Sequence, residues 1–283
     1  MGRIPARQLP ECLKIIPSPP KQLFYRGAEP EKLLKKPRLA VIGSRRVTAY
    51  GRQVTTELVS TLAEQGILIV SGLAIGVDAL AHQAALAAGG LTIAVLPGDV
   101  DAPYPASNRR LSRQIVEQGG ALVSEYESGV INFKINFIAR NRLVAGLSQA
   151  VLITEAAEKS GSLHTARFAL EQGKDVLVVP GNIHSPTSVG ANNLIKAGAT
   201  AVTSYRDVLY AMKLQDHRTS AREVRGRNPE EQSVLDLMLQ GINEGDDLLA
   251  QSGLSTPEFN QVLTMLEIGG KIRALGGNMW SLY

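Results

Sequence analysis

Two adjacent arginines at the end of an apolar segment give the sequence its clearest anion-binding pattern. Arg45 and Arg46 follow Gly43 and Ser44, which end the apolar run 39–42. Such a run is typical of a buried parallel strand, and the apolar residues after it have helical spacing. A strand, a small-residue turn and a helix start direct backbone N–H groups and the helix dipole at one point. The turn lacks the dinucleotide-binding glycine pattern and the phosphate-loop lysine, so the arginines supply the cations here, unless they are only solvated surface charges.

Small, hydroxylic, basic and aromatic residues also follow the other predicted strands. Small residues let backbone N–H groups approach phosphate oxygens, and arginine, asparagine and phenylalanine add charge, hydrogen bonds and stacking surface. Each has an ordinary alternative, because glycine is common in turns, asparagine caps helices and phenylalanine packs in cores. The candidate binding residues are Gly43, Ser44, Arg45, Arg46, Gly72, Asn108, Arg109, Arg110, Phe137, Arg140, Asn141, Arg142, Ser160, Gly161 and Ser162.

The elements that would position these residues alternate between strand-like and helix-like sequence from residue 38 to 214. This alternation predicts an α/β fold with an extended Rossmann-like, doubly wound and mostly parallel sheet. In open sheets of this kind, the ligand crevice lies outside the carboxyl ends of the strands. We therefore expect the turns to lie together at one edge. The predicted strands include 39–42, 67–70, 91–96, 121–123, 150–153, 175–179 and 199–202.

Other regions flank this alternating segment. Residues 1–37 are rich in proline and lysine and predict an arm or lead-in that packs on the main domain, with a strand at 23–25. Residues 215–228 are polar and without pattern, as in a linker. Residues 229–283 predict three helices and a terminal hairpin, the arrangement of a winged helix. We expect a Rossmann-like domain at 38–214 and a winged-helix domain at 229–283.

Charge divides unequally along the chain. Residues 1–227 hold 28 Lys and Arg against 18 Asp and Glu, a net charge of +10, whereas residues 228–283 hold 2 against 8, a net charge of −6. A basic body favours a polyanionic partner, and an acidic unit is poorly suited to holding phosphates. The predicted recognition helix at 255–269 has only Glu258 and Glu267 as charged residues. The winged helix is therefore expected to contact protein, to pack on the main domain or to inhibit by mimicking DNA, rather than to bind a DNA groove.

Several classes of protein are disfavoured by what the sequence lacks. No apolar run approaches the roughly 20 residues that a membrane span needs, and the N-terminus has no apolar stretch of a secretory signal. Cys12 is the single cysteine, which excludes an internal disulfide and a cysteine-based zinc site, and the four histidines show no ligand spacing. We expect a cytoplasmic protein without metal, cofactor or membrane contact.

A set of short motifs stands in a fixed order between about residues 38 and 204: Gly43-Ser-Arg, Ser71-Gly-Leu-Ala-x-Gly-Val-Asp78, Gly89-Gly-x-Thr-Ile-Ala-Val-Leu96, Tyr104-Pro-x-x-Asn108, Arg140-Asn-Arg-x-x-Ala-Gly-Leu-Ser148, Ser160-Gly-Ser-Leu-x-Thr-Ala166 and Val179-Pro-Gly181. The ordered set resembles the DprA/Smf family of bacterial DNA-processing proteins. The predicted winged helix is similar to the usual C-terminal module of that family. Ile75 departs from the pattern, since the family often has a basic residue there.

The resemblance implies a single-stranded DNA-binding protein that protects incoming DNA and loads RecA onto it during natural transformation and homologous recombination, commonly as a homodimer. It implies that Arg45 clamps a phosphate from the first turn. Arg109 or Arg110 would then hold the next phosphate, and the segment from Arg140 to Arg142 would line the same groove. The family resemblance implies no catalytic residue and no cofactor.

An enzyme is the main alternative. Some Rossmann-like folds are nucleotide N-glycosidases of the LOG type, which pair a glycine-rich phosphate loop with a catalytic arginine and glutamate. Candidate carboxylates here are Asp78, Glu125 and Glu155. The characteristic Pro-Gly-Gly-x-Gly-Thr-x-x-Glu of those enzymes is absent, however, and the motif that begins at Ser160 occupies the comparable place. The DNA-binding interpretation is therefore favoured.

Overall fold

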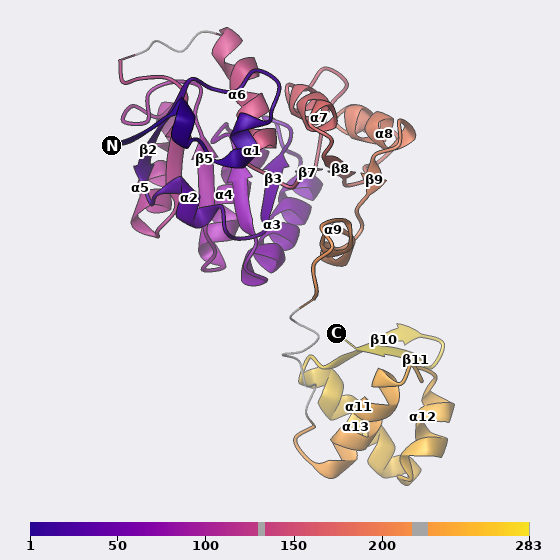
Figure 1. The fold of residues 1–283 in the computed structure, drawn as a ribbon. Helices are drawn as coiled ribbons and strands as arrows, with labels where there is room; N and C mark the ends of the chain where they lie inside the picture. The colour runs from indigo at the N-terminus through magenta and orange to yellow at the C-terminus, as the bar shows by residue number, and fades with distance from the viewer. Residues whose placement is uncertain (130–133, 217–225, 283) are drawn as a thin grey trace. The chain divides into compact units, whose positions relative to one another are not determined.

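The chain forms two compact units, Met1–Asp216 and His217–Tyr283 (Figure 1). The structure is a computed structural model that describes residues 1–129, 134–216 and 226–282. The linker expected at 215–228 lies largely outside these residues. Among the described residues, no helix is both long enough and apolar enough to cross a bilayer.

A nine-stranded sheet forms the centre of the described part of the first unit, in the order β1-β2-β6-β5-β4-β3-β7-β8-β9. Neighbouring strands from β6 to β9 pair in parallel, which confirms the predicted doubly wound, mostly parallel sheet. These strands are β3 (Arg38–Ile42), β4 (Leu68–Ser71), β5 (Thr92–Val95), β6 (Ala121–Ser124), β7 (Ala150–Ile153), β8 (Asp175–Val178) and β9 (Thr200–Ala201).

The N-terminal stretch extends this sheet. β1 (Gly2–Pro5) pairs antiparallel with β2 (Gln22–Gly27), and β2 pairs antiparallel with β6. Leu23 and Phe24 are buried, so this stretch contributes to the core. The segment expected to be an arm or lead-in thus contributes two strands to the sheet. The strand expected at 23–25 is present, but as part of the sheet itself.

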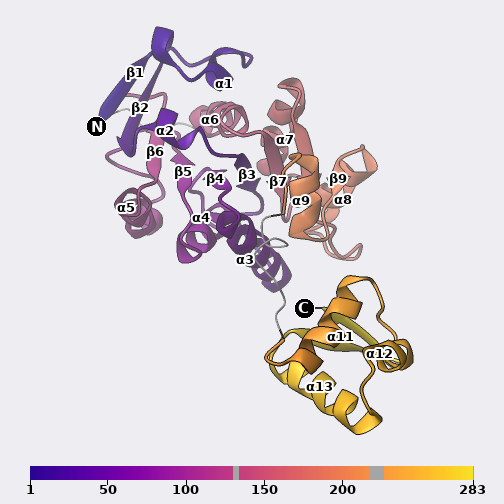
Figure 2. The same ribbon diagram turned by 60° about the horizontal axis from the view of Figure 1, so that its bottom comes forward.

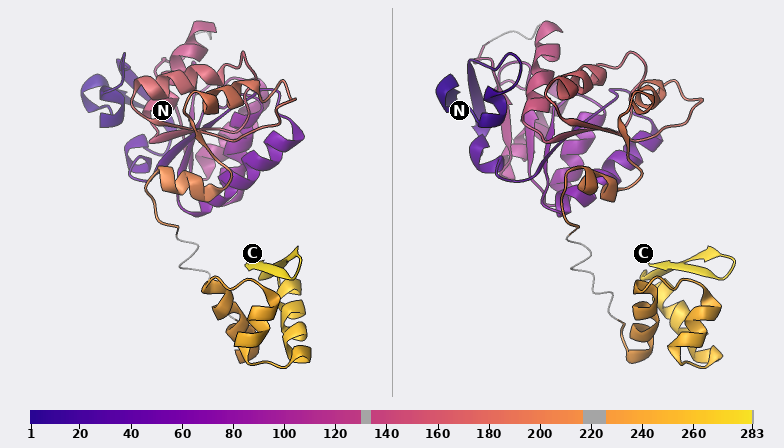
Figure 3. Two further views of the ribbon diagram at one scale, coloured as in Figure 1. Left: turned by 90° about the vertical axis from the view of Figure 1, so that its right-hand side faces the viewer. Right: turned by 45° about the vertical axis from the view of Figure 1, so that its right-hand side comes forward.

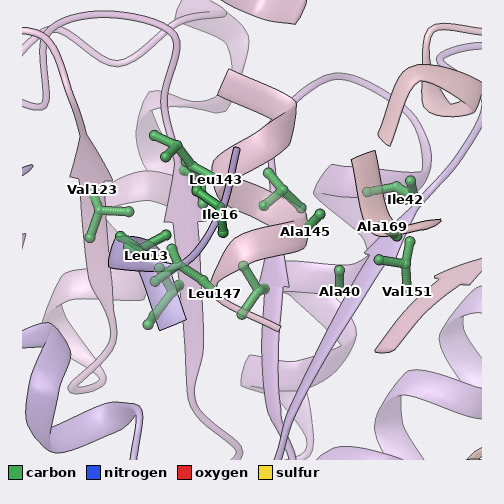
Figure 4. Close-up of a cluster of buried hydrophobic side chains, with 14 of the residues drawn as sticks. Leu13, Ile16, Ala40, Ile42, Val123, Leu143, Ala145, Leu147, Val151 and Ala169 are labelled. Carbon is green, nitrogen blue, oxygen red and sulfur yellow. The ribbon is translucent and has the colours of Figure 1, made fainter. Parts of the chain in front are cut away.

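Along each strand, side chains alternate between the two faces of the sheet. Helices cover both faces. Ala40 and Ile42 face one layer, formed by α1 (Glu11–Lys14), α6 (Lys134–Gly146), α7 (Ser162–Glu171) and α8 (Val189–Lys196). Figure 4 shows side chains of α1 and α6 packed together on that face. Leu39 and Val41 face the opposite layer, which holds α3 (Ala49–Glu64), α4 (Val77–Ala87), α5 (Arg109–Glu117) and α9 (Tyr205–Ala211). In Figure 3 the sheet lies between the two layers, and Figure 2 shows α3 beside α4. Short pieces η1 (Ala6–Gln8), α2 (Pro30–Leu33) and η2 (Ala106–Asn108) complete this unit.

The direction of winding reverses beside β3. From β3 the chain adds β4, β5 and β6 on one side, and it later returns to add β7, β8 and β9 on the other. At such a topological switch point, the turns after the two neighbouring strands diverge and leave a crevice between them. Ligands of open sheets bind in this crevice. The turns that follow β3 and β7 meet this condition.

Lys174 fixes the end of α6, the helix that carries four of the candidate residues. Its Nζ donates to the carbonyl oxygens of Ala145, Gly146 and Ser148, at 2.5, 2.8 and 2.6 Å. A cation at a helix C-terminus satisfies carbonyl groups that have no partner in the helix and complements the dipole. Burial lowers the pKa of Lys174 to about 8. Lys174 thus fixes the orientation of α6 over the sheet at the C-terminal end of the helix.

The second unit is a winged helix, as predicted. It contains α11 (Pro229–Leu239), α12 (Gly245–Ser252), α13 (Thr256–Ile268) and a hairpin of β10 (Ile272–Gly276) and β11 (Met279–Leu282). This unit has its own hydrophobic core, which buries Phe259, Val262, Leu263 and Leu266 of α13. Ser255 and Glu258 form a capping box at the start of α13, which fixes where the helix begins.

Candidate nucleic-acid interface

The turn after β3 is clamped between the segments that follow β4 and β7. The Ser44 amide donates to the Glu155 carbonyl at 2.8 Å, and the Ser44 carbonyl accepts from the Val77 amide at 3.1 Å. Gly76 has a φ of +85°, and a Cβ there would lie 2.2 Å from the Ser44 oxygen. Only glycine fits this position without displacing the turn. The predicted meeting of turns from separate strands therefore occurs at the switch point.

Two buried carboxylates hold these turns from inside. The Glu155 carboxylate accepts from the backbone amide of Thr48 at 3.2 Å and from the Thr48 hydroxyl. Asp78 accepts from the amides of Gly72 at 3.1 Å and Ala74 at 3.4 Å. Burial raises the pKa of Asp78, and the nearby Arg140 guanidinium acts in the opposite direction. Both carboxylates are engaged in positioning the backbone.

An exposed cation lies against an aromatic ring at this edge, and that ring packs against a second one. Arg45 and Arg46 are exposed, and the Arg45 Cζ lies 5.9 Å from the centre of the Phe137 ring. The Tyr104 ring meets Phe137 edge to face, with centres 5.5 Å apart, and Tyr104 is 51% exposed. A guanidinium over an aromatic face is held electrostatically and stays available to an anion. Arg45, Phe137 and Tyr104 are called the aromatic–arginine cluster below.

Tyr104 was not among the candidate residues predicted from the sequence. It occurs in the motif Tyr104-Pro-x-x-Asn108, so the signal was present but gave no role to the ring. The loop between β5 and α5 brings it to Phe137, which comes from a different part of the chain. Asn108 ties the same loop to the segment after β4, because its Nδ2 donates to the Leu73 carbonyl at 2.9 Å.

Arg140 does not line an exposed groove, which corrects the expectation for this residue. It is 4% exposed, and its Nη1 donates to the carbonyls of Gly72, at 2.5 Å, and Val95. A Cβ on Gly72 would lie 2.4 Å from this nitrogen, so glycine is needed for the guanidinium to fit. Burial lowers the pKa of Arg140 to about 10. From the interior, Arg140 therefore stabilises the turns after β4 and β5 by these hydrogen bonds.

Arg142 also differs from the expectation, because its charge is already paired. Its Nη1 and Nη2 donate to the Glu125 carboxylate at 2.7 and 2.6 Å, in a pair that is largely buried. The Nε donates to the Ser18 carbonyl, which ties α6 to the N-terminal stretch. Asn141 lies half-buried between the two arginines and accepts from the Arg140 Nε at 3.3 Å. The segment 140–142 therefore organises the edge rather than offering free cations.

The remaining candidates lie at helix starts on the same edge. Ser160 and Ser162 have hydroxyl oxygens 2.7 Å apart at the start of α7, and the exposed Gly161 between them leaves open space around its Cα. Arg109 and Arg110 are exposed at the start of α5. Because each helix follows a parallel strand, these starts lie at the carboxyl ends of β7 and β5. They are brought to the edge but not into contact with the aromatic–arginine cluster.

The chain matches two protein-family models. The model described as DNA recombination-mediator protein A matches residues 3–213, and the model of the DprA winged helix domain matches residues 218–278. The first match alone covers most of the sequence and all of the edge described above. The chain belongs to the DprA/Smf family. The resemblance seen in the ordered motifs is thereby confirmed.

Relatives within the DprA/Smf family show how much of them this chain represents. It is 42% identical to protein Smf of Escherichia coli over 84% of this chain and 66% of that protein. It is 44% identical to DNA processing protein DprA of Streptococcus pneumoniae, over 67% of this chain and 66% of that protein. The chain therefore spans just under two thirds of the length of these two relatives.

Two solved DprA structures have the same fold over the matched region. The X-ray structure of DprA from S. pneumoniae has a TM-score of 0.70 at 40% identity and covers 76% of this chain and 75% of its own. The structure of DprA from Helicobacter pylori, described in terms of its single-stranded DNA binding mode, has a TM-score of 0.66 at 38% identity. It covers 72% of this chain and 93% of its own.

Proposed function

We propose that this chain binds single-stranded DNA at the carboxyl edge of its sheet, with the aromatic–arginine cluster as the centre of the site. The observation that carries the proposal is the exposed Arg45 guanidinium beside Phe137, whose ring meets that of Tyr104, at the topological switch point. Single-strand binders combine a cation for the backbone with aromatic faces on which bases stack. A cation and two rings contributed by three separate segments meet that requirement.

The surroundings of the cluster suit an unpaired strand. Glycine and serine turns let backbone N–H groups approach phosphate oxygens, and the helix starts of α4 and α7 lie at the same edge. Ile75 and Ile138 are 49% and 42% exposed, so the rim is partly apolar. Apolar surface can pack against bases but cannot hold phosphate, so Arg45 and Arg46 would carry most of the backbone contact.

Relatives support this assignment. The H. pylori DprA structure is described by its single-stranded DNA binding mode, and it aligns with nearly three quarters of this chain. The net charge of +10 over residues 1–227 favours a polyanion in the same region. As further parts of the proposal, the chain would protect incoming DNA, load RecA onto it during transformation and recombination, and act as a homodimer. Band shifts of single-stranded oligonucleotides, with and without RecA, test the loading step.

The decisive experiment replaces Arg45 and measures binding of the full chain to oligo-dT across a range of salt. Arg45→Glu is expected to weaken binding by roughly tenfold or more, since hydrogen bonds to charged groups contribute about 1.5–3 kcal/mol. It should also reduce the magnitude of the slope of log K against log salt by about 0.7 for each phosphate that the variant no longer neutralises.

Arg167 offers a matched control for this experiment. Its guanidinium is exposed and lies 5.5 Å from the Phe168 ring on α7, as Arg45 lies beside Phe137, although Arg167 also forms an exposed ion pair of 3.3 Å with Glu171. Arg167→Glu changes the net charge equally and should leave affinity and slope near those of the unaltered chain. An unchanged slope and affinity in Arg45→Glu would remove Arg45 from the site.

No observation favours nucleotide hydrolysis as a second function. The three candidate carboxylates are all committed: Glu125 pairs with Arg142, Glu155 holds Thr48, and Asp78 accepts from backbone amides. A general acid or base must reach the reacting atom of its substrate, and these groups face inward. We therefore propose that the chain is not an N-glycosidase, and release of base from AMP or NAD by the purified chain would contradict this.

A further inference from the structure

A groove lies beside the loop that carries Tyr104. It has a volume of about 440 Å³ and is formed by α5 and the loop after β5, above β2 and β6. Its lining includes Arg26, Asp101, Arg109, Arg113 and Glu117 as charged residues and the buried Leu122 as apolar floor. The groove therefore combines a polar rim with a shallow apolar base.

The charged residues of this groove differ in whether they are already paired. Arg26 and Asp101 form an ion pair of 3.1 Å and neutralise each other. Arg109 and Arg113 are exposed, four residues apart on α5, so they lie on neighbouring turns of the same helix face. Within residues 1–129, 134–216 and 226–282, neither guanidinium forms an ion pair or a hydrogen bond with another residue. Two guanidinium groups are thus available against the one remaining carboxylate, Glu117.

One short segment connects this groove to the aromatic–arginine cluster. Tyr104 contacts Phe137 on one side, Asn108 binds the Leu73 carbonyl, and Arg109 lines the groove immediately afterwards. Arg109 comes about five positions after Tyr104, so their Cα atoms are at most about 18 Å apart even in a fully extended chain. The turn η2 between them shortens this distance further. A strand of a few nucleotides can therefore reach from one to the other.

We propose that this groove binds the sugar–phosphate backbone of the single strand whose bases stack on the aromatic–arginine cluster, with Arg109 and Arg113 each contacting a phosphate. This inference rests on the proposed function, because it extends the same DNA path. Guanidinium groups match phosphate oxygens with paired N–H donors, which suits two arginines at this spacing. Arg113 thereby becomes a DNA contact in addition to the candidate residues predicted from the sequence.

The experiment compares short and long oligo-dT, of about 5 and about 20 nucleotides, since single-strand sites span roughly 4–16 nucleotides. Arg113→Gln and the double variant Arg109→Gln/Arg113→Gln each remove charge at exposed positions. For the long oligonucleotide the double variant should lose on the order of tenfold in affinity or more, with the salt slope reduced by about 1.4 for two phosphates. For the short one, affinity should stay within about twofold of the unaltered chain.

Lys196→Gln is the control for loss of charge, because Lys196 is exposed at the C-terminal end of α8, away from the carboxyl edge. Circular dichroism confirms that each variant is folded. The inference is overturned if the double variant binds both lengths like Lys196→Gln, or if it weakens both lengths equally. Arg45→Glu should weaken both lengths, which distinguishes the two sites. If the unaltered chain binds neither length, the proposed function and this extension fail together.

Discussion

The carboxyl edge of the sheet and the exposed face of α13 are both surfaces on which proteins of these architectures bind nucleic acid. At the sheet edge, Arg45 is exposed beside the Phe137 ring, which packs against Tyr104. On α13 the charged residues are Glu258 and Glu267, and the helix has no lysine or arginine. The fold supplies a suitable surface in each case, but the side chains make only the first one attractive to phosphate. Binding is therefore decided by the residues placed on a fold and not by the fold itself.

Arg140→Leu should have the largest effect and should act on the first region alone. It removes a buried cation that holds the Gly72 and Val95 carbonyls and lies near Asp78. Breaking such a buried charged contact costs about 3–5 kcal/mol of unfolding free energy. The sheet unit should unfold at lower denaturant and lose DNA binding, whereas the winged helix should be unaffected.

The chain carries its own reporter for this test. Trp280 is the single tryptophan and packs, partly buried, against the core of the winged-helix unit, so its fluorescence follows that unit. Circular dichroism follows the helices of both units. The contrast breaks down if Arg140→Leu shifts the Trp280 transition as much as the circular dichroism transition. Arg167→Leu, at an exposed position, should shift neither.

Phe137→Ala sharpens the contrast by separating stacking from charge at the sheet edge. Loss of a stacked base costs about 1–3 kcal/mol, which lowers affinity for oligo-dT by roughly 5- to 150-fold. The slope of log K against log salt should not change, because Arg45 still neutralises its phosphate. Phe168→Ala is the matched control, since that ring also lies beside an arginine. Equal reductions in the two variants would show that stability and not stacking is being measured.

His82 should make the sheet unit sensitive to acid. It is buried, its Nδ1 lies 2.6 Å from the Thr92 hydroxyl, and that hydroxyl donates to the Ile69 carbonyl. Burial lowers the pKa of His82 from 6.5 to about 3. Between these values the unfolded chain binds a proton that the folded chain does not, so stability falls as the pH falls. The slope is about 1.4 kcal/mol per pH unit.

Urea unfolding followed by circular dichroism at pH values of about 5.5 and 4.5 measures this slope. His82→Asn keeps a donor toward Thr92 but does not titrate, so its stability should depend less steeply on pH. The comparison concerns slopes, since the smaller side chain also lowers stability at every pH. A slope equal to that of the unaltered chain would assign the acid sensitivity to other groups.

The sequence predicts the sheet and the meeting of its turns because both follow from local pattern. Continuous apolar runs identify parallel strands, and glycine or serine after each run identifies the turns. The winged helix likewise follows from helical spacing and a terminal hairpin. The pairing of β2 with β6 was not predicted, because it joins residues about 100 positions apart. Nothing local to 22–27 indicates that partner.

The depth of the arginines could not be predicted either. Arg45 and Arg140 both belong to motifs rich in small residues, yet one is exposed and the other is buried. The difference arises from the carbonyls of Gly72 and Val95, which are distant in sequence and meet Arg140 only in the folded chain. The burial and pairing of the Arg142 side chain depend in the same way on Glu125, which it meets in the folded chain. Residue type alone therefore overestimates the free positive charge of the edge.

Removing the winged helix should have the smallest effect, and this is the sharpest test of the comparison. α13 itself carries no lysine or arginine, and the neighbouring Lys271 is already paired, 3.1 Å from the Glu231 carboxylate. A chain ending at residue 216 should therefore bind duplex DNA within about twofold of the full chain at physiological salt. Conversely, Gln261→Lys/Glu267→Lys places cations on the exposed face of α13, and it should raise duplex affinity and steepen the salt slope by about 0.9 per additional phosphate neutralised. If truncation abolishes duplex binding, α13 binds DNA despite its acidic face, and the contrast between the two surfaces is wrong.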